Sequence, residues 1–467
     1  MIPTTTAASI VMIVGLALTY LLLPDGGSVA IYRTAAIGAA LAIGGGVLLE
    51  AQRGLRSLVR TDLVMIVALF GLTLVEFFFP QEAVDKSVSA LSATHGVEAL
   101  FLGFSGLIIG RHFLSLRRPV VASTMPIQWS TTTLFRLYVM LLFGGYFYML
   151  WTVSFDPVEL INQMLRPRFS QPWARGRLGG WSELVGEFGG LLLYLVPAIA
   201  GSILANPHRS TYLQKTVVVL GLLFTLFNGF SSGTRNVFCV YLAIFVATYI
   251  LLKPDMSWRR VIVLSCMTAG ILYLSAYYML QFRNVGLEGY IERGAGASGW
   301  REETLFVDNN LPVISRLTDA FPDRADYLGW EIVSFSILHP VPRALWPSKP
   351  EKLSVSAEDA LGLRGLTLSS TFVGEAYMMG GYPAIVLVGL VFGWLGGWWN
   401  RFGLDLRSNA SVILYASGFF AALISMRSVL WTTTAMLPTV AIWLYARLRK
   451  RRVQSRQFQS IGPKPRP

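Results

Sequence analysis

The chain has 467 residues, of which 54% are hydrophobic and 14% are charged, and its mean hydropathy is +0.54. A soluble domain carries about 25% charged residues, so this composition argues against a soluble protein and favours a lipid bilayer as the solvent. The net charge of +13 lies in short clusters between apolar runs. That pattern orients helices in a membrane, so we expect no nucleic-acid partner.

Apolar segments follow one another along the chain, and a helix that crosses a bilayer needs about 20 such residues. They predict an all-α, polytopic integral membrane protein with about 12 transmembrane helices. The candidate spans lie at approximately residues 5–23, 31–49, 62–80, 94–111, 134–154, 184–205, 215–231, 236–252, 260–280, 380–400, 409–427 and 428–447.

Basic residues between the spans predict the orientation of the chain. Loops that fall on one side are rich in arginine and lysine, which marks the cytoplasmic side under the positive-inside rule. Both termini are therefore predicted to be cytoplasmic, and anionic membrane lipids would hold the basic tail at residues 448–467. The basic residues of these inner loops are Arg53, Arg56, Arg60, Arg111, Arg117, Arg118, Arg209, Lys215, Lys253, Arg259, Arg260, Arg401 and Arg407.

A short basic loop at residues 155–183 departs from this rule, because the topology places it outside. Its arginines include Arg168 and Arg175. Moving such a loop across the membrane is disfavoured, so its arginines are expected to serve a purpose there. They either bind an anionic ligand or pair with lipid headgroups and with acidic residues of a later loop. Arginine suits phosphate because its planar fork donates two parallel hydrogen bonds.

The longest polar segment, residues 281–370, separates a first membrane domain (residues 1–280) from a last block of about three spans (residues 371–447). A connection of this length is usually functional or disordered. Its aromatic residues and interleaved charges favour a folded extracytoplasmic loop with short helices. We expect the chemistry of the protein to lie there.

Three arginines, Arg235, Arg283 and Arg427, fall at the outer ends of their spans and near this loop. They form either a shared anion pocket or separate ion pairs at the membrane rim. Arg235 belongs to the polar turn at residues 231–236, whose small and hydroxyl side chains suit a phosphate cradle. His339 is either a general base or a residue that structures a Pro-rich turn.

Several absent motifs narrow the chemistry. The sequence has no Walker-type Gly-rich loop with lysine, which argues against ATP hydrolysis. It has no HExxH motif and no Cys/His cluster, which argues against a catalytic zinc. We therefore expect no metal and no cofactor.

Four motifs in order, together with the spans between them, carry a resemblance to a family. They are Ser232-Gly-Thr-Arg-Asn236, Gln281-Phe-Arg283, Pro342-Arg-Ala-Leu-Trp-Pro-Ser-Lys-Pro350 and Ser370-Thr-Phe-Val-Gly-Glu-Ala-Tyr-Met-Met-Gly-Gly-Tyr-Pro383. Their combination, over roughly residues 160–430, resembles the bacterial O-antigen and exopolysaccharide repeat-unit polymerases of the Wzy type. The resemblance implies a GT-C-like membrane fold in the bacterial inner membrane.

The resemblance also implies an activity and partners. The activity is metal-independent glycosyl transfer at the periplasmic face, in which undecaprenyl-diphosphate-linked oligosaccharide repeat units are polymerised. The expected partners are a chain-length regulator and a flippase. An O-antigen ligase would share the donor and the architecture, and a lipid-linked oligosaccharide flippase or other transporter is a third possibility.

This activity needs positive charge on the leaving diphosphate and a base or good positioning for the acceptor hydroxyl. For the diphosphate we expect Arg235, Arg283, Arg343 and Arg427, and Arg168 and Arg175 would guide the lipid-linked substrate. The candidate bases are Glu375 and His339.

Overall fold

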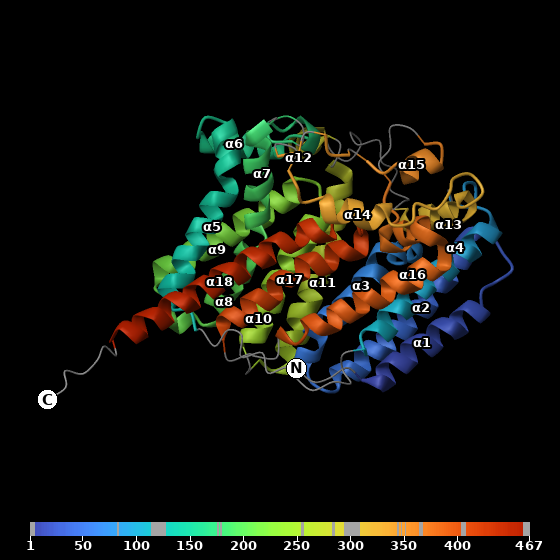
Figure 1. Cartoon of the computed structure of the whole chain (residues 1–467), viewed down its shortest axis with the longest axis horizontal. Coiled ribbons are helices and arrows are strands. Elements are labelled where there is room, and N and C mark those ends of the chain that lie inside the picture. Colours follow the sequence, from blue (N-terminus) through green and yellow to red (C-terminus); the bar gives the residue numbers. More distant parts are fainter. Residues whose placement is uncertain are drawn as a thin grey trace.

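The computed structural model describes residues 5–81, 84–113, 128–174, 177, 180–253, 256–282, 285–293, 309–342, 345–346, 348–350, 352–363, 368–402 and 408–460. These residues form helices and their connections, with no β-strand among them (Figure 1). The helices of the bundle are α1 (Thr6–Leu21), α2 (Ser28–Ala51), α3 (Thr61–Thr73), α4 (Ala90–Gly110), α5 (Thr131–Thr152), α7 (Gly180–Leu193), α8 (Val196–Ala205), α9 (Tyr212–Ser231), α10 (Arg235–Leu252), α11 (Trp258–Phe282), α16 (Thr371–Trp399), α17 (Asn409–Arg427) and α18 (Thr432–Ser460).

Within the described residues, nine helical stretches are long and apolar enough to cross a membrane, counting α7 and α8 together. The helices α1 and α3 are apolar but shorter. The all-helical, polytopic membrane class is thus confirmed, and all of the predicted segments are helical over most of their length. The number of about 12 crossings stays a prediction.

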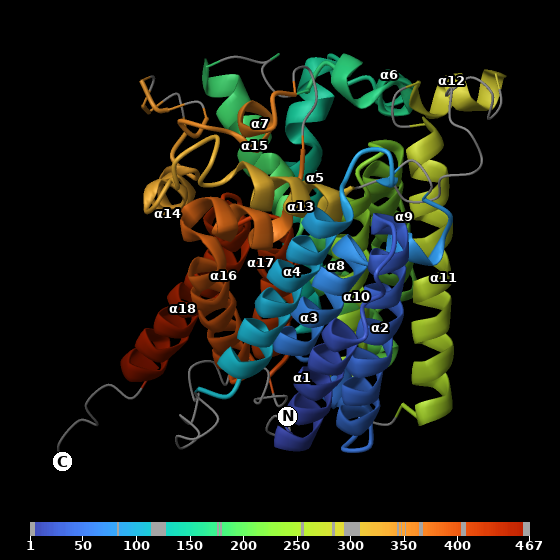
Figure 2. The same ribbon diagram turned by 90° about the vertical axis from the view of Figure 1, so that its right-hand side faces the viewer.

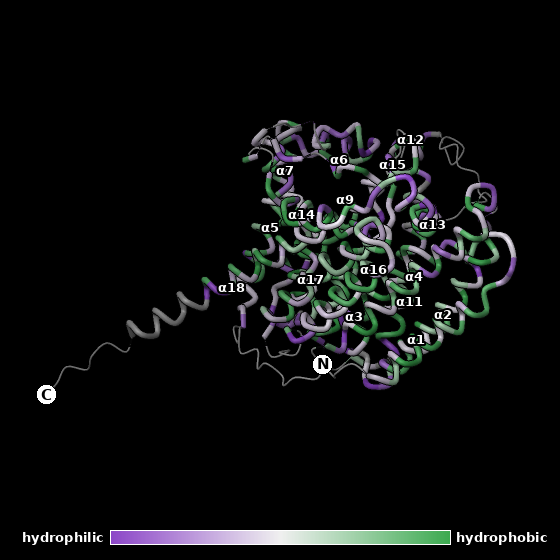
Figure 3. The backbone as a smooth tube through the Cα atoms, turned by 45° about the vertical axis from the view of Figure 1, so that its right-hand side comes forward, coloured by the Kyte–Doolittle hydropathy of each residue, from purple (hydrophilic) through white to green (hydrophobic). Residues whose placement is uncertain are grey.

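Large apolar side chains lie exposed around the middle of the bundle. Leu41 is 73% exposed and Leu48 is 67% exposed, both on α2, and Leu220 on α9 is 61% exposed. Figure 3 shows hydrophobic backbone through the middle of the bundle and hydrophilic segments toward its two ends. Such a surface would aggregate in water, so lipid is its natural surrounding.

The two ends of the bundle carry different segments. The short helices α6 (Pro157–Leu165), α12 (Gly286–Arg293) and α15 (Ala357–Ala360) lie at one end, which we call the loop end (Figure 2). The helix α1 begins and α18 ends toward the opposite end, which we call the tail end. The described parts of segments 155–183 and 281–370, both predicted to be outside, therefore share one end.

One helix of the long segment is part of the bundle core. In α13 (Asn310–Ala320), Leu311, Ile314 and Leu317 are fully buried, and the helix packs against α4. Ser315 in α13 hydrogen-bonds the Tyr32 hydroxyl of α2 at 2.6 Å. The segment expected to be a polar loop thus sends an apolar helix face into the bundle, and this anchors the rest of the loop.

The helices α4 and α16 pack at backbone contact because glycines line both surfaces. A Cβ added at Gly110 would lie 2.2 Å from the Leu390 carbonyl oxygen, and one at Gly393 would lie 2.3 Å from that of Leu107. Small residues four apart allow this close approach in membranes, where packing rather than water drives helix association. The contact fixes α16, which carries Glu375.

A kink in α16 attaches the long segment to this helix. Gly381 has a φ of +70°, a conformation that favours glycine, and Pro383 lacks the N–H that would bond to the Met379 carbonyl. That carbonyl instead accepts a hydrogen bond from the Gly329 N–H at 3.0 Å, and the Met378 carbonyl accepts one from Leu328 at 2.8 Å. The Gly-Gly-Tyr-Pro sequence thus leaves two carbonyl groups of α16 to accept hydrogen bonds from the backbone just before α14 (Glu331–Leu338).

Candidate functional site

Several of the predicted site residues meet at the connection between α17 and α18. We call residues 427–434 the junction. Side chains from α10, α14 and α16 contact it, although these helices are far apart in the sequence.

Glu375, in the second turn of α16, accepts hydrogen bonds from the junction through both carboxylate oxygens. One oxygen accepts from the Ser428 hydroxyl at 2.6 Å. The other accepts from the backbone N–H groups of Val429 at 2.5 Å and Leu430 at 3.3 Å. A carboxylate held by several donors is a strong structural clamp, so Glu375 fixes the path of the junction directly after Arg427.

Arg427 contacts the polar turn between α9 and α10. With its amide oxygen turned toward Arg427, Asn236 accepts hydrogen bonds from Nε at 3.0 Å and from Nη1. Asn236 follows Arg235 in the first turn of α10, and Gly233 before it has a φ of +63° that favours glycine. The predicted neighbourhood of Arg235 and Arg427 is therefore present, with Asn236 as the connection.

Arg168 approaches the same region from the basic loop. The positive charges of Arg168 and Arg427 both act on the half-buried Tyr194, which lies between α7 and α8. The Tyr194 ring stacks on Phe420 of α17 at a centroid distance of 3.6 Å. The basic loop and the junction thus lie within electrostatic range of one half-buried tyrosine.

His339, directly after α14, faces the other side of the junction. Its Nδ1 lies 2.8 Å from the Thr434 hydroxyl, and its ring lies 4.2 Å from that of Trp431. Lys349 donates hydrogen bonds to the carbonyl oxygens of His339 at 2.7 Å and Val341 at 2.9 Å. The lysine folds the Pro-rich run back on itself, so this histidine both structures a turn and contacts the junction.

The predicted set is therefore partly assembled. Glu375, His339 and Arg427 contact or belong to the junction, and Arg235 adjoins it through Asn236. Arg175, Arg283 and Arg343 lie outside the described residues. Within the described ranges, no group of three or more His, Cys, Asp and Glu side chains is placed to hold a metal ion.

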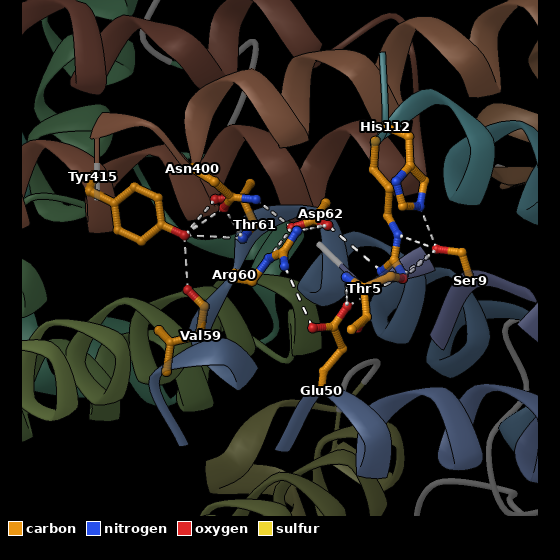
Figure 4. Close-up of polar contacts among 11 residues, drawn as sticks. Thr5, Ser9, Glu50, Val59, Arg60, Thr61, Asp62, His112, Asn400 and Tyr415 are labelled. Carbon is orange, nitrogen blue, oxygen red and sulfur yellow. Dashed lines mark hydrogen bonds and ion pairs between the residues drawn. The ribbon is translucent and has the colours of Figure 1, made fainter. Parts of the chain in front are cut away.

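Sequence reasoning missed a buried charge network at the tail end (Figure 4). Arg60 and Arg111, interpreted from the sequence as loop charges that set orientation, are only 2% and 1% exposed. Asp62 lies 2.8 Å from Arg60 and 3.7 Å from Arg111, and Glu50 lies 3.6 Å and 3.5 Å from the same guanidiniums. Two features of the sequence signal this network: Glu50 lies near the end of one apolar run, and Asp62 lies near the start of the next.

The network ties several helices together. Asn400, directly after α16, bonds to Asp62 and accepts from the Tyr415 hydroxyl of α17 at 2.8 Å. The Ser9 hydroxyl of α1 accepts from Arg111 and lies 2.6 Å from His112. Burial, together with the Arg111 charge, lowers the pKa of His112 below its ordinary value. The charges of the four ion-paired side chains balance in a closed cluster, which points to a structural clamp.

The chain matches no protein-family model, no curated protein and no solved structure. Likeness to known proteins therefore assigns it no family, and its function has to be argued from the site itself.

Proposed function

We propose that the protein is a glycosyltransferase that polymerises lipid-diphosphate-linked oligosaccharide repeat units at the loop end of the bundle. The observation that carries this proposal is the junction, at which three separate sequence motifs meet. The turn at residues 232–236 reaches it through Asn236 and the segment at residues 370–383 through Glu375. The Pro-rich run at residues 342–350 reaches it indirectly, because its Lys349 bonds the carbonyl of His339, which contacts Thr434. These are the motifs on which the resemblance to the Wzy-type polymerases rests.

The proposed reaction transfers a growing glycan from its lipid diphosphate to an incoming lipid-linked unit. An acceptor hydroxyl oxygen attacks the anomeric carbon and forms the new glycosidic bond. The bond from that carbon to the diphosphate oxygen breaks, and the oxygen keeps the electron pair. The hydroxyl proton passes to a base, and the charge that develops on the diphosphate is stabilised by arginine.

The geometry suggests a division of roles for the residues that touch the junction. Arg427 and Arg235 are the cations that would face the leaving diphosphate, and Arg168 in the basic loop would attract the anionic substrate. Glu375 holds the junction through three hydrogen bonds, which makes it a positioning residue for Arg427. His339, whose Nδ1 is oriented by Thr434, is then the better placed candidate base.

Deletion of the gene followed by analysis of surface polysaccharide tests the function. A polymerase deletion should leave single repeat units on the carrier or the cell surface. Long chains that remain on the carrier would instead identify a ligase, and repeat units trapped on the cytoplasmic side would identify a flippase. Either of these results would overturn the proposal.

A further inference from the structure

A cavity at the tail end lies apart from the junction and is used by none of the chemistry above. Its volume is about 670 Å³. It lies between the starts of α5 and α17 and the ends of α8 and α10, beside the short 3-10 helix at Leu55–Val59. Its polar lining includes Arg56, Gln128, Ser130, Asn206, Arg209 and Asn409.

The wall of the cavity is held by specific contacts. The Trp129 backbone N–H donates to Asn409 Oδ1 at 2.8 Å, and Asn409 Nδ2 donates to the Trp129 carbonyl at 2.8 Å. This pair fastens the start of α5 to the start of α17. The Trp129 ring also packs edge-on against Tyr445 of α18, at 5.5 Å between centroids. This wall of the cavity is therefore made of elements fixed to one another.

The lining is graded from a charged mouth to an apolar floor. Arg209 is exposed and Arg56 is half-buried, whereas Leu134 and Ile203 are buried. Among the described residues, those that line the cavity include two arginines and no acidic side chain. Guanidinium groups without a carboxylate partner in the same cavity favour an oxyanion as ligand, because their paired N–H groups match its oxygens.

We propose that this cavity binds a phosphate-type oxyanion, carried either by the headgroup of an anionic phospholipid or by a free phosphate. Arg56 and Arg209 would hold the oxygens at the mouth. Because the site lies at the opposite end from the junction, the proposal does not depend on the proposed glycosyl transfer.

The test uses the full chain reconstituted in nanodiscs. One arm uses phosphatidylcholine with added phosphatidylglycerol and measures retained phosphatidylglycerol by native mass spectrometry. The other arm uses phosphatidylcholine alone and measures thermal stabilisation by inorganic phosphate. The variant is Arg56→Ala/Arg209→Ala. The matched control is Arg259→Ala/Arg260→Ala, which removes two exposed charges from the first turn of α11 at the same end.

The variant should lose roughly tenfold or more in affinity for its ligand, and the control should behave as wild type. Loss of phosphatidylglycerol retention alone supports a lipid headgroup, and loss of phosphate stabilisation supports a free phosphate. Equal losses in both double variants would overturn the proposal, because bulk charge would then explain the binding. Wild-type protein that shows neither effect overturns it without need of any variant.

Discussion

Replacing Glu375 by glutamine tests whether this carboxylate organises the junction. The substitution keeps the side-chain shape but turns one acceptor oxygen into an amide donor. Both oxygens of Glu375 now accept hydrogen bonds, from the Ser428 hydroxyl and from two backbone N–H groups. With its NH₂ turned toward Ser428, the amide can donate to that hydroxyl, but the N–H groups of Val429 and Leu430 then bond a neutral amide oxygen in place of a carboxylate, and these two bonds weaken.

The contacts set the size of the effect. Exchanging the carboxylate for a neutral amide oxygen at two buried N–H groups costs about 1–3 kcal/mol in all, and each 1.36 kcal/mol lost from transition-state stabilisation is tenfold in rate. If the junction positions Arg427, Glu375→Gln should slow polymerisation by roughly tenfold to a hundredfold. Ser428→Ala removes a single hydrogen bond, worth about 0.5–1.5 kcal/mol, and should slow it a few-fold.

The assay is the initial rate of chain extension by purified, reconstituted protein acting on lipid-linked repeat units. Ser425→Ala is the matched control, because the Ser425 hydroxyl bonds within its own helix, to the Ala421 carbonyl at 2.6 Å. It should leave the rate unchanged. Wild-type rates in both Glu375→Gln and Ser428→Ala would refute the reasoning. An inactive Glu375→Gln beside an unaffected Ser428→Ala would assign Glu375 the role of base instead of positioning.

Other predictions concern stability and the remaining arginines. Asp62→Asn leaves the buried guanidinium charges of Arg60 and Arg111 without one of their carboxylate partners, and it should lower the free energy of unfolding by about 3–5 kcal/mol in mixed micelles. Asp359→Asn, which breaks an exposed ion pair with Lys352, should change the free energy of unfolding little. Equal effects of the two substitutions would contradict the buried network. Gly393→Ala places a Cβ against the α4 backbone and should lower the thermal stability of the protein. Gly44→Ala places its Cβ in open space and should leave the thermal stability unchanged. Wild-type stability of Gly393→Ala would contradict the close α4–α16 packing. Arg283→Ala should abolish polymerisation with normal membrane insertion, and full activity would remove this residue from the diphosphate site.

The helices were predictable because the length of each apolar run identifies a helix without any knowledge of tertiary contacts. The kink in α16 was in principle readable too, since Gly380-Gly-Tyr-Pro383 interrupts an apolar run. The hydrogen-bond partners of the carbonyl groups at the kink could not be predicted from the sequence. The partner of the Met379 carbonyl is Gly329, and nothing local in either segment specifies the pairing.

The site was partly predictable for a similar reason. Arg235, Arg427 and Glu375 stand out as charges at the ends of apolar spans, which is a local and energetic signal. Asn236 carries no such signal, because a neutral amide in a turn is ordinary. The burial of Arg60 and Arg111 could not be predicted, because basic residues at the ends of spans usually face solvent.

The central claim is that Arg427, held by Asn236 and by the Glu375 clamp, stabilises the diphosphate during chain extension. The most direct measurement is the chain-length distribution of surface polysaccharide in a gene-deletion strain complemented with Arg427→Ala, with Arg401→Ala at the tail end as the control. We predict single repeat units with Arg427→Ala and long chains with Arg401→Ala, at equal protein levels in the membrane. Long chains of wild-type length and amount with Arg427→Ala would contradict the account.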